Sequence, residues 1–479
     1  MSTEKEQNSG LNTKSFITSV IILFILMTVT YLLTFIIPSG EYDKIMLNSQ
    51  ENIVSGTYKT VPGGISLLKW ILSPILALGA DGGVTMIAII IFLLVIGGTF
   101  NALEHSGILK YMLDKITHKY KDKKYKLLCI ITLFFMTLGT AVGSFEEVVP
   151  MVPIAIALSY SMGWDALVGL GMSILAVGCG FSTGVLNPFT VGIAQELAGL
   201  PMFSGISVRI ISYVLIYLIL ILFLVRYAKK IEKNPRLSLV YNESAFSDNL
   251  QASEKSYVKD KKMDRGLMSF ASILGTGILI ILLSSLVKFL QAIIMPVIAL
   301  IFLISGIVSV IASGTSFREY TRLFGKGVLG ILPAALLILM AGSIKYTMVE
   351  AKIMDTILFN SVNLIESIPN GIVIIFIYII ILAMDFFISS GSAKAFLLMP
   401  LITPMVDLVG ISRQVSVLAF AFGDGFSNLF YPTNPVLLIS LGLAGISYKN
   451  WIKWSIKIQI QIILTTSIIL LLAQHLGYS

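Results

Sequence analysis

The chain has 479 residues, of which 56% are hydrophobic and 13% are charged, and its mean hydropathy is +0.90. Soluble domains are about 45–50% apolar, so this composition predicts an all-α polytopic membrane protein whose spans each need about 20 apolar residues. The net charge of +8 lies in short basic loops, as the positive-inside rule requires, and does not indicate nucleic-acid binding. Two cysteines and three histidines at unrelated positions exclude a disulfide framework and a metal cluster.

The first part of the chain predicts two spans joined by a polar loop. Residues 1–14 are polar and predict a cytoplasmic N-terminus, and residues 15–37 form a retained span without a signal-peptide cleavage pattern. The loop contains an interfacial amphipathic segment at 64–80. The second span, 84–103, is followed by a basic cluster at 110–126, which predicts that this side faces the cytoplasm.

A helical hairpin is predicted next. The apolar run that begins at Leu127 covers roughly 14 residues, too few for a comfortable span, and it meets a polar tip at 139–147 before a return run. This pattern predicts a re-entrant hairpin over 127–162, because irregular backbone at mid-membrane must be buried or line a cavity. The following helix, 166–198, carries three glycines, a Ser-Thr pair and Asn-Pro at 178–188, which predicts an interruption there.

The second half has the same parts. Residues 227–266 are polar and charged and predict a cytoplasmic linker between a first repeat, 15–226, and a second repeat, 267–479, which has one extra span. A second hairpin is predicted at 372–409 and a second interrupted helix at 413–444, with its break at 423–435. The other predicted spans are 208–225, 267–287, 292–312, 327–348 and 454–473.

Residues 143–190 and 390–437 share one layout at a constant offset of 247 positions. The matches are mostly residues that punctuate helices: Pro153 with Pro400, Gly163 with Gly410, Gly178 with Gly425, Asn187 with Asn434, and Pro188 with Pro435. An odd number of predicted spans separates the hairpins, so the two copies enter the membrane from opposite sides and the C-terminus lies outside. Such inverted-topology repeats are typical of secondary transporters. The chain has no Walker A motif for an ATP-driven pump, and the two breaks contain no nucleophile and base pair for an enzyme.

Polar side chains gather at the two hairpin tips and the two breaks. Backbone groups without helical partners and charges within apolar segments are costly in a membrane. They are therefore candidates for binding a substrate or an ion. The predicted substrate site comprises Ser144, Glu146, Glu147, Ser182, Thr183, Asn187, Ser389, Ser390, Ser392, Lys394, Asp424, Asn428, Thr433 and Asn434. No cofactor or structural metal is predicted. A coupling ion, either H⁺ or Na⁺, is a possible partner, and sodium would bind near Asn187 and Asn434.

The charges leave two readings open. Lys394 takes the place of Glu147 at the 247-residue offset, and it either pairs with a nearby acid or contacts the cargo. The apolar segments carry four acids and one base: Glu146, Glu147, Asp385, Asp424 and Lys394. This excess favours a cargo with an ammonium or guanidinium group over a dicarboxylate, unless burial protonates some of the acids. Asp407 and Arg413 flank the second hairpin and are expected either to pair or to extend their charged ends toward water.

Four motifs together carry a resemblance to a known family: GSFEE, FSTGVLNPFT, DFFISSGSAKAF and FGDGFSNLFYPTNP. The chain resembles the YfcC-like branch of the C4-dicarboxylate anaerobic carrier (DcuC-type) family, in the ion transporter superfamily, and this branch is similar to arginine/ornithine antiporters. The resemblance covers almost the whole chain. It implies an elevator-type transporter in a bacterial inner membrane, in which hairpins and broken helices move against a scaffold that commonly forms homodimers within the lipid.

The resemblance is less specific for cargo. In sodium-coupled relatives, Ser-Asn-Thr clusters at the tips and breaks hold sodium, whereas the tips here carry Glu146-Glu147 and Lys394. A fixed ammonium at a tip would suit exchange without sodium. The function expected from these features is exchange of basic amino acids such as arginine and ornithine. The alternative is sodium- or proton-coupled symport of C4-dicarboxylates or other anionic metabolites.

Overall fold

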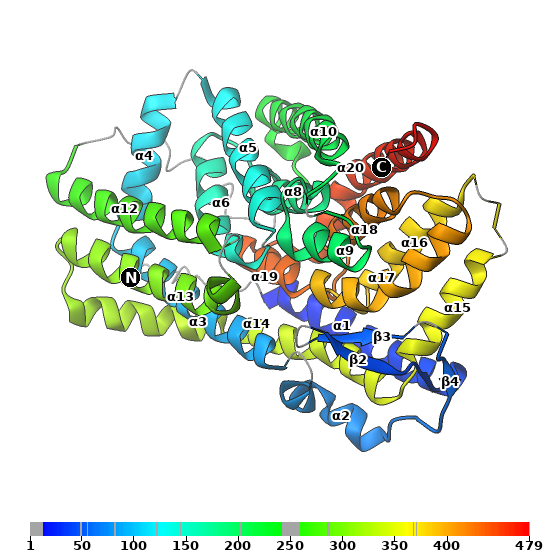
Figure 1. Ribbon diagram of the computed structural model, residues 1–479. Coiled ribbons are helices and arrows are strands. Elements are labelled where there is room, and N and C mark those ends of the chain that lie inside the picture. The colour runs from blue at the N-terminus through cyan, green and yellow to red at the C-terminus, as the bar shows by residue number, and fades with distance from the viewer. Residues whose placement is uncertain are drawn as a thin grey trace.

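A computed structural model shows a mostly helical protein with two short strand pairs at one edge (Figure 1). It describes residues 13–47, 50–54, 56–80, 83–120, 123–143, 145–201, 203–241, 259–284, 288–366, 368–369 and 371–478.

The helices of the first half are α1 Thr13–Ile36, α2 Leu67–Leu76, α3 Gly83–His105, α4 Ile108–Tyr120, α5 Lys124–Val142, α6 Val152–Ser161, α7 Ala166–Leu170, α8 Ala176–Thr183, α9 Ile193–Leu197 and α10 Ile206–Lys233. Shorter 3-10 or π turns connect or extend them: η1 Ala77–Gly79, η3 Glu146–Met151, η4 Gly171–Leu175, η5 Pro188–Gly192 and η6 Pro235–Leu237. The helices of the second half are α12 Lys261–Ser284, α13 Lys288–Ala312, α14 Phe317–Glu350, α15 Met354–Glu366, α16 Val373–Asp385, α17 Gly391–Leu408, α18 Arg413–Ser427, α19 Pro435–Ala444 and α20 Tyr448–His475.

Six helices in the described part of the chain are long and apolar enough to cross a membrane. They are Met86–His105, Lys124–Ala141, Ala166–Thr183, Ile206–Lys233, Phe317–Glu350 and Tyr448–His475. Parts of α1 and α13 are shorter apolar helices, Val20–Ile36 and Pro296–Ala312.

The outer helices carry the surface expected for contact with lipid. In α10, Ile216, Leu220 and Leu224 recur every fourth residue and are fully buried, while Leu218 and Leu222 are about half exposed (49% and 54%). A soluble amphipathic helix would place polar residues on that exposed side. Apolar residues on both sides fit a helix with protein on one side and lipid on the other.

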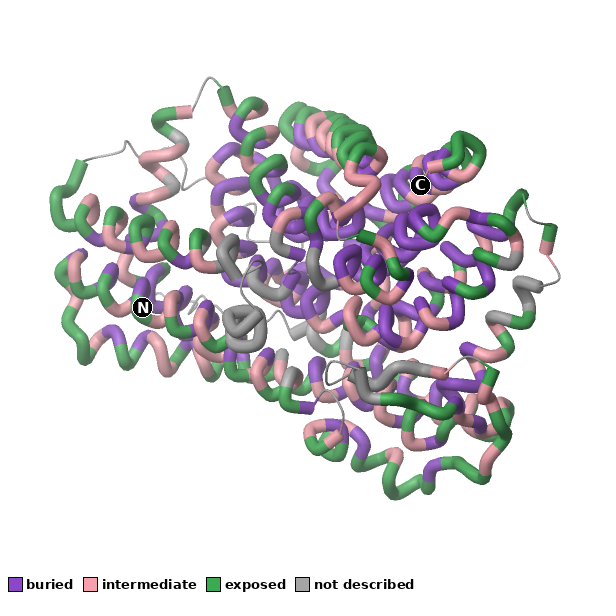
Figure 2. Tube along the Cα trace, in the orientation of Figure 1, coloured by how far each residue is buried: buried purple, intermediate pink, exposed green. Residues whose placement is uncertain are grey.

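The helices at the centre are buried all round. Every residue of Ala166–Thr183 is buried, and so are the residues of α18 after Arg413 (Figure 2). These two segments lie side by side in the middle of the protein, and α5 and α16 pack against them (Figure 1). The centre therefore consists of the interrupted helices and the hairpins that were predicted to line the site.

Several predicted helix ends were wrong. The helix predicted from residue 127 begins at Lys124 and ends at Val142, a length of 19 residues instead of 14. The span predicted at 208–225 continues to Lys233, and α14 has 34 residues. Hydropathy detects only the apolar part of a helix, and lysine and arginine extend these helices beyond it because their long stems reach toward water.

The strands in the loop after α1 were not predicted. β1 Gly40–Glu41 pairs with β4 Lys59–Thr60, and β2 Lys44–Leu47 pairs with β3 Gln50–Ile53, both antiparallel. The Gly40 amide donates to the Lys352 carbonyl (2.8 Å), and the Tyr58 ring stacks on Phe359 with centroids 4.0 Å apart. β3 also packs against α17 (Figure 1). The loop thus joins the turn after α14 to the second hairpin.

Candidate functional site

The two interrupted helices meet through glycines. A Cβ added to Gly425 of α18 would lie 2.1 Å from the Ser182 hydroxyl oxygen, and one added to Gly178 of α8 would lie 2.6 Å from the Leu429 side chain. At the offset of 247, Gly178 corresponds to Gly425 and Ser182 corresponds to Leu429. The contact of Gly425 with Ser182 in one direction is thus matched by the contact of Gly178 with Leu429 in the other. These two contacts are therefore related to each other by the repeat.

The breaks are shorter than predicted, and they begin later. Gly178 and Gly180 are helical, and the first break covers only residues 184–187. Gly423 and Gly425 are also helical, and the second break covers residues 428–434. These glycines allow close packing: a Cβ on Gly180 would lie 1.9 Å from the Met136 carbonyl oxygen of α5. The prediction that they unwind the helices was wrong, because glycine suits both close packing and unwinding.

Thr140 of α5 holds the first break. Its hydroxyl accepts a hydrogen bond from the Val185 amide (2.9 Å) and contacts the Thr183 hydroxyl (3.2 Å), and its carbonyl accepts from Leu186 (3.1 Å). The Gly184 backbone is left-handed, with φ of 52°, which ends α8. Two backbone amides of this break thus donate to the neighbouring hairpin.

α20 satisfies the second break in a similar way. The Leu429 carbonyl accepts hydrogen bonds from the Trp451 indole (2.9 Å) and the Gln459 amide (3.1 Å). The Phe430 carbonyl accepts from the Tyr448 hydroxyl at 2.5 Å. The expectation that freed carbonyls would serve as ligands therefore fails for these two positions, because side chains of α20 already donate to them.

Asn187 and Asn434 occupy equivalent positions at the start of the second half-helices. The Asn434 side-chain oxygen accepts from the Val436 and Leu437 amides at 2.9 and 3.2 Å and caps α19. The Asn187 side-chain oxygen accepts from the Thr190 amide at 3.2 Å. The Asn434 amide also donates to Asn428 at 2.5 Å. Both predicted residues are helix caps, a role that asparagine commonly has.

The predicted hydroxyls of α8 bond to their own helix. Ser182 donates to the Gly178 carbonyl and Thr183 to the Gly180 carbonyl, each at 2.7 Å. Both side chains are fully buried. Their protons are therefore used locally, which is the usual arrangement for Ser and Thr inside a helix.

Three charged side chains form a buried cluster, which we call the charge triad: Asp385, Lys394 and Asp424. The Lys394 ammonium donates to Asp385 Oδ1 and, at 2.8 Å, to Asp424 Oδ1. All three residues are at most 1% exposed. They come from the end of α16, the first turn of α17 and the last turn of α18, so the triad joins three helices.

The triad answers the question that the sequence left open for Lys394, which pairs with two aspartates. Asp385 was among the charges noted in the sequence but was not included in the predicted site. No sequence pattern links the three, because Lys394 lies 9 positions from Asp385 and 30 from Asp424. Their charge within apolar helices was the only signal that singled them out.

Two carboxylate oxygens of the triad have no hydrogen-bond partner among the described residues: Asp385 Oδ2 and Asp424 Oδ2. The buried hydroxyls of Thr190 and Thr433 also lack one there. A Cβ on Gly391 would lie 2.6 Å from Asp424 Oδ2 and 2.7 Å from the Thr190 methyl group, so these two residues flank the same point of the α17 backbone. Thr190 belongs to the first repeat and was not predicted as a site residue.

The predicted serines of the second tip differ from the triad in exposure. Ser389 and Ser390 are exposed, and the hydroxyls of Ser390 and Ser392 lie 3.4 Å apart. η3 begins at Glu146, but the side chains of Glu146 and Glu147, and all of Ser144, lie outside the described residues. Of the two arrangements expected for Asp407 and Arg413, the structure shows the pair, because Arg413 donates 2.6–3.1 Å hydrogen bonds to Asp407.

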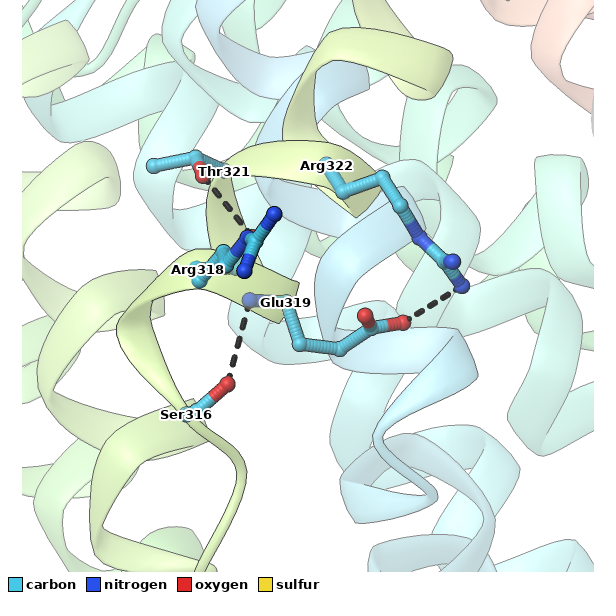
Figure 3. A pocket seen from close by; sticks show the side chains of 5 residues that line it. All are labelled: Ser316, Arg318, Glu319, Thr321 and Arg322. Atoms are coloured by element: carbon cyan, nitrogen blue, oxygen red, sulfur yellow. Dashed lines mark hydrogen bonds and ion pairs between the residues drawn. The ribbon is translucent and has the colours of Figure 1, made fainter.

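A separate surface pocket of about 530 Å³ lies at the start of α14 (Figure 3). Its lining residues are Ser316, Arg318, Glu319, Thr321 and Arg322. The Ser316 hydroxyl caps the helix by accepting from the Glu319 amide (3.2 Å), and Arg322 pairs with Glu319 (2.8 Å). These are local helix-capping and i,i+3 interactions. None of these residues belongs to the predicted site.

A mostly helical chain whose described part has six membrane-length helices and charges buried at its centre fits a polytopic membrane transport protein. The chain belongs to the C4-dicarboxylate anaerobic carrier family (DcuC), whose sequence pattern matches residues 16–476. Its membership makes it a multi-pass membrane transporter and points away from an enzyme.

Two relatives are similar over most of their length. One is "Putative basic amino acid antiporter YfcC" of Escherichia coli (strain K12), 29% identical over 82% of this chain and 79% of its own. The other is a Haemophilus influenzae (strain ATCC 51907 / DSM 11121 / KW20 / Rd) protein of unassigned function, 26% identical over 98% of both chains.

Two solved structures align with the chain at low similarity. The Alcanivorax borkumensis YdaH transporter is 16% identical, with 97% of this chain and 98% of that chain covered and a TM-score of 0.44. Neisseria gonorrhoeae MtrF is 15% identical, with 95% and 94% covered and a TM-score of 0.44.

Proposed function

We propose that this protein is a secondary active transporter that exchanges basic amino acids, such as arginine and ornithine, across the cytoplasmic membrane. The observation that carries this proposal is the excess of acid in the charge triad. One ammonium faces two carboxylates, a sum of −1 when all three are ionised, and each carboxylate keeps one oxygen without a partner in the described chain. A buried site with this charge favours a cationic cargo.

The name of the Escherichia coli relative agrees with such a cargo. The alternative is sodium- or proton-coupled symport of C4-dicarboxylates or other anionic metabolites, which the family description and the presence of an ammonium favour. Two features weigh against an anion. Lys394 already donates to two aspartates, and the first amides of α19 already donate to Asn434. An anionic cargo would have to displace these internal acceptors.

For the mechanism we propose two inverted repeats that work as an elevator. The reciprocal contacts of Gly178 and Gly425, and the equivalent caps Asn187 and Asn434, support a pseudo-twofold relation between the halves. The moving part would consist of α5–α9 and α16–α19. The scaffold would contain the remaining helices and would form a homodimer in the lipid. The N-terminus and the 227–266 linker would face the cytoplasm, and the C-terminus the outside.

Counterflow tests the cargo directly. Purified protein is reconstituted into proteoliposomes that contain unlabelled ornithine, and uptake of labelled arginine is compared with uptake of labelled succinate into liposomes that contain unlabelled succinate. We expect saturable arginine uptake that depends on internal ornithine. Succinate exchange without arginine exchange would contradict the proposal and favour the dicarboxylate alternative. Uptake that neither saturates nor depends on internal substrate would indicate a channel.

A further inference from the structure

We propose that Asp385 and Asp424 form a site for a small monovalent cation, and that the Lys394 ammonium occupies this site permanently. The protein would thus carry its own cation in a place where a coupled transporter binds one from solution. The site is inferred from the geometry of the charge triad and rests on the proposed function only for its consequence for exchange.

The first support is the kind and number of oxygens at this point. Each aspartate gives one oxygen to the Lys394 ammonium and keeps a second, buried oxygen without a hydrogen bond from any described residue. The Thr190 methyl group flanks Asp424 beside Gly391, and the buried Thr190 hydroxyl has no partner in the described chain either. Carboxylate and hydroxyl oxygens are the ligands that hard cations prefer.

The second support is the local potential. Asp385 is the last residue of α16, where the helix carbonyls already make the potential negative. Asp424 adds a second negative charge, and both side chains are at most 1% exposed. Two ionised carboxylates this close repel each other, and a cation between them offsets that repulsion. Lys394 fills that role.

The third support is the placement of Lys394 itself. It lies in the first turn of α17, where the helix dipole disfavours a positive charge. Lys394 is fully buried, with an exposed fraction of 0%. A buried charge in this position is costly unless it is paired, so the two carboxylates decide where the ammonium lies. The two aspartates therefore hold the ammonium as they would hold a free cation.

The functional consequence follows from the covalent bond. A cation from solution must bind and leave in every cycle, which couples transport to its gradient. An ammonium attached to the chain reduces the charge of the site from −2 to −1 in both orientations of a carrier and never leaves. Transport would then be independent of sodium and potassium, as exchange between two amino acids requires.

The test removes the resident cation and supplies another. Thermal stability of full-length Lys394→Ala in detergent is measured in sodium, potassium or methylammonium chloride, against N-methyl-D-glucamine chloride at equal ionic strength. Because a ligand that binds only the folded state raises its stability, we expect saturable stabilisation of Lys394→Ala by at least one small cation. Wild type should be indifferent. Lys394→Met, which fills the space with a neutral side chain, and Lys59→Ala, which removes an exposed lysine paired with Asp43, should also be indifferent.

The same variants are then compared in counterflow. Lys394→Ala should lose at least about tenfold of its exchange rate when the small cation is replaced by N-methyl-D-glucamine, a factor within the usual range of couplings between sites, whereas wild type should not change. If Lys394→Ala does not fold in any salt, Asp385→Asn combined with Lys394→Ala takes its place, because its net charge of −1 equals that of the wild-type triad.

Three results would overturn the proposal. The first is a variant whose stability is the same in all four salts. The second is stabilisation of the variant by acid pH alone, which would mean that protonation replaces the lysine. The third is a wild-type protein whose exchange needs sodium. Since the stability assay contains no cargo, its outcome does not depend on whether arginine or succinate is the substrate.

Discussion

The sequence singles out Lys394, Asp385 and Asp424 as charged residues in apolar segments, but it does not show that they pair with one another. A charge in an apolar helix stands out because it is costly, and all three were noticed for that reason. Their pairing was not predictable, because it depends on how α16, α17 and α18 pack. Asn187 and Asn434 show the converse. Their repeat positions suggested ligands, whereas the structure places both at helix N-termini as caps.

At the first tip, we predict that Glu146→Gln and Glu147→Gln each reduce exchange of cationic cargo. A carboxylate attracts an ammonium or guanidinium group more strongly than an amide does, and hydrogen bonds to charged groups contribute about 1.5–3 kcal/mol. A loss of one such bond corresponds to a rise in KM of about tenfold to a hundredfold. The measurement is the concentration dependence of arginine counterflow.

The control for these two variants is their yield and elution as folded protein, which should match wild type. Asp407→Asn serves as a matched change, because Asp407 pairs with Arg413 and lies 41% exposed outside the triad. Unchanged kinetics in both glutamine variants would contradict the prediction and indicate that Glu146 and Glu147 have a structural role only.

At the scale of helices, most of the fold was predictable and the breaks were not. Long apolar runs determine that a helix exists, whereas the glycines at 178, 180, 423 and 425 could either loosen a helix or let another approach it. The structure shows close approach in all four cases. The strands between α1 and α2 were missed because segments of two to four residues carry too little alternation to be recognised.

Gly180→Ala should destabilise the protein strongly. Its Cβ would lie 1.9 Å from the Met136 carbonyl oxygen, so α5 and α8 would have to separate. Overpacking of a buried contact typically costs about 1–3 kcal/mol. We expect a lower melting temperature in detergent, measured by loss of the monodisperse species on heating.

Gly275→Ala is the matched control, because a Cβ there meets nothing within 4 Å and alanine favours helix. It should be neutral or slightly stabilising. Equal stability of the two variants would mean that α5 and α8 are not held as closely as the structure places them.

The loop after α1 should loosen in alkaline solution. Burial, and next the negative charge of Asp355, raise the pKa of the Tyr42 hydroxyl to about 12, against about 10 in an unfolded chain. The folded value is the higher one, so the contribution of the neutral phenol is complete below pH 10 and is lost as the pH rises from about 10 to about 12. Limited proteolysis of the loop at about pH 9 and pH 11 should show faster cleavage at the higher pH.

Tyr42→Phe has no proton to lose in that range. Its loop should therefore be cleaved at the same rate at both values, apart from the change in protease activity measured on a denatured substrate. A variant that loosens as much as wild type would show that another group is responsible.

At the scale of the whole molecule, the proposed elevator requires that the central helices slide past the scaffold. Leu438 of α19 lies in one buried cluster with Leu23 of α1 and Ile344 of α14. A disulfide between Leu438→Cys and Ile344→Cys, in a chain without Cys129 and Cys179, would join the two parts. We expect the oxidised variant to lose counterflow and to regain it on reduction.

A disulfide within the scaffold, Leu23→Cys with Ile344→Cys, is the control and should leave exchange unchanged. Exchange that continues in the crosslinked Leu438 variant would rule out sliding at this surface. Gates that open and close around fixed central helices would then be the better mechanism.

The glycine contacts between α8 and α18 have one more consequence for such a carrier. Gly425 lies directly against the Ser182 side chain, and Gly178 lies directly against the Leu429 side chain. Two surfaces packed this tightly move together as a single body. The compartment between their breaks would therefore keep its dimensions while it travels. A solute would meet the same walls on either side of the membrane and bind with similar intrinsic affinity at both, so that only its concentrations set the direction of net flow.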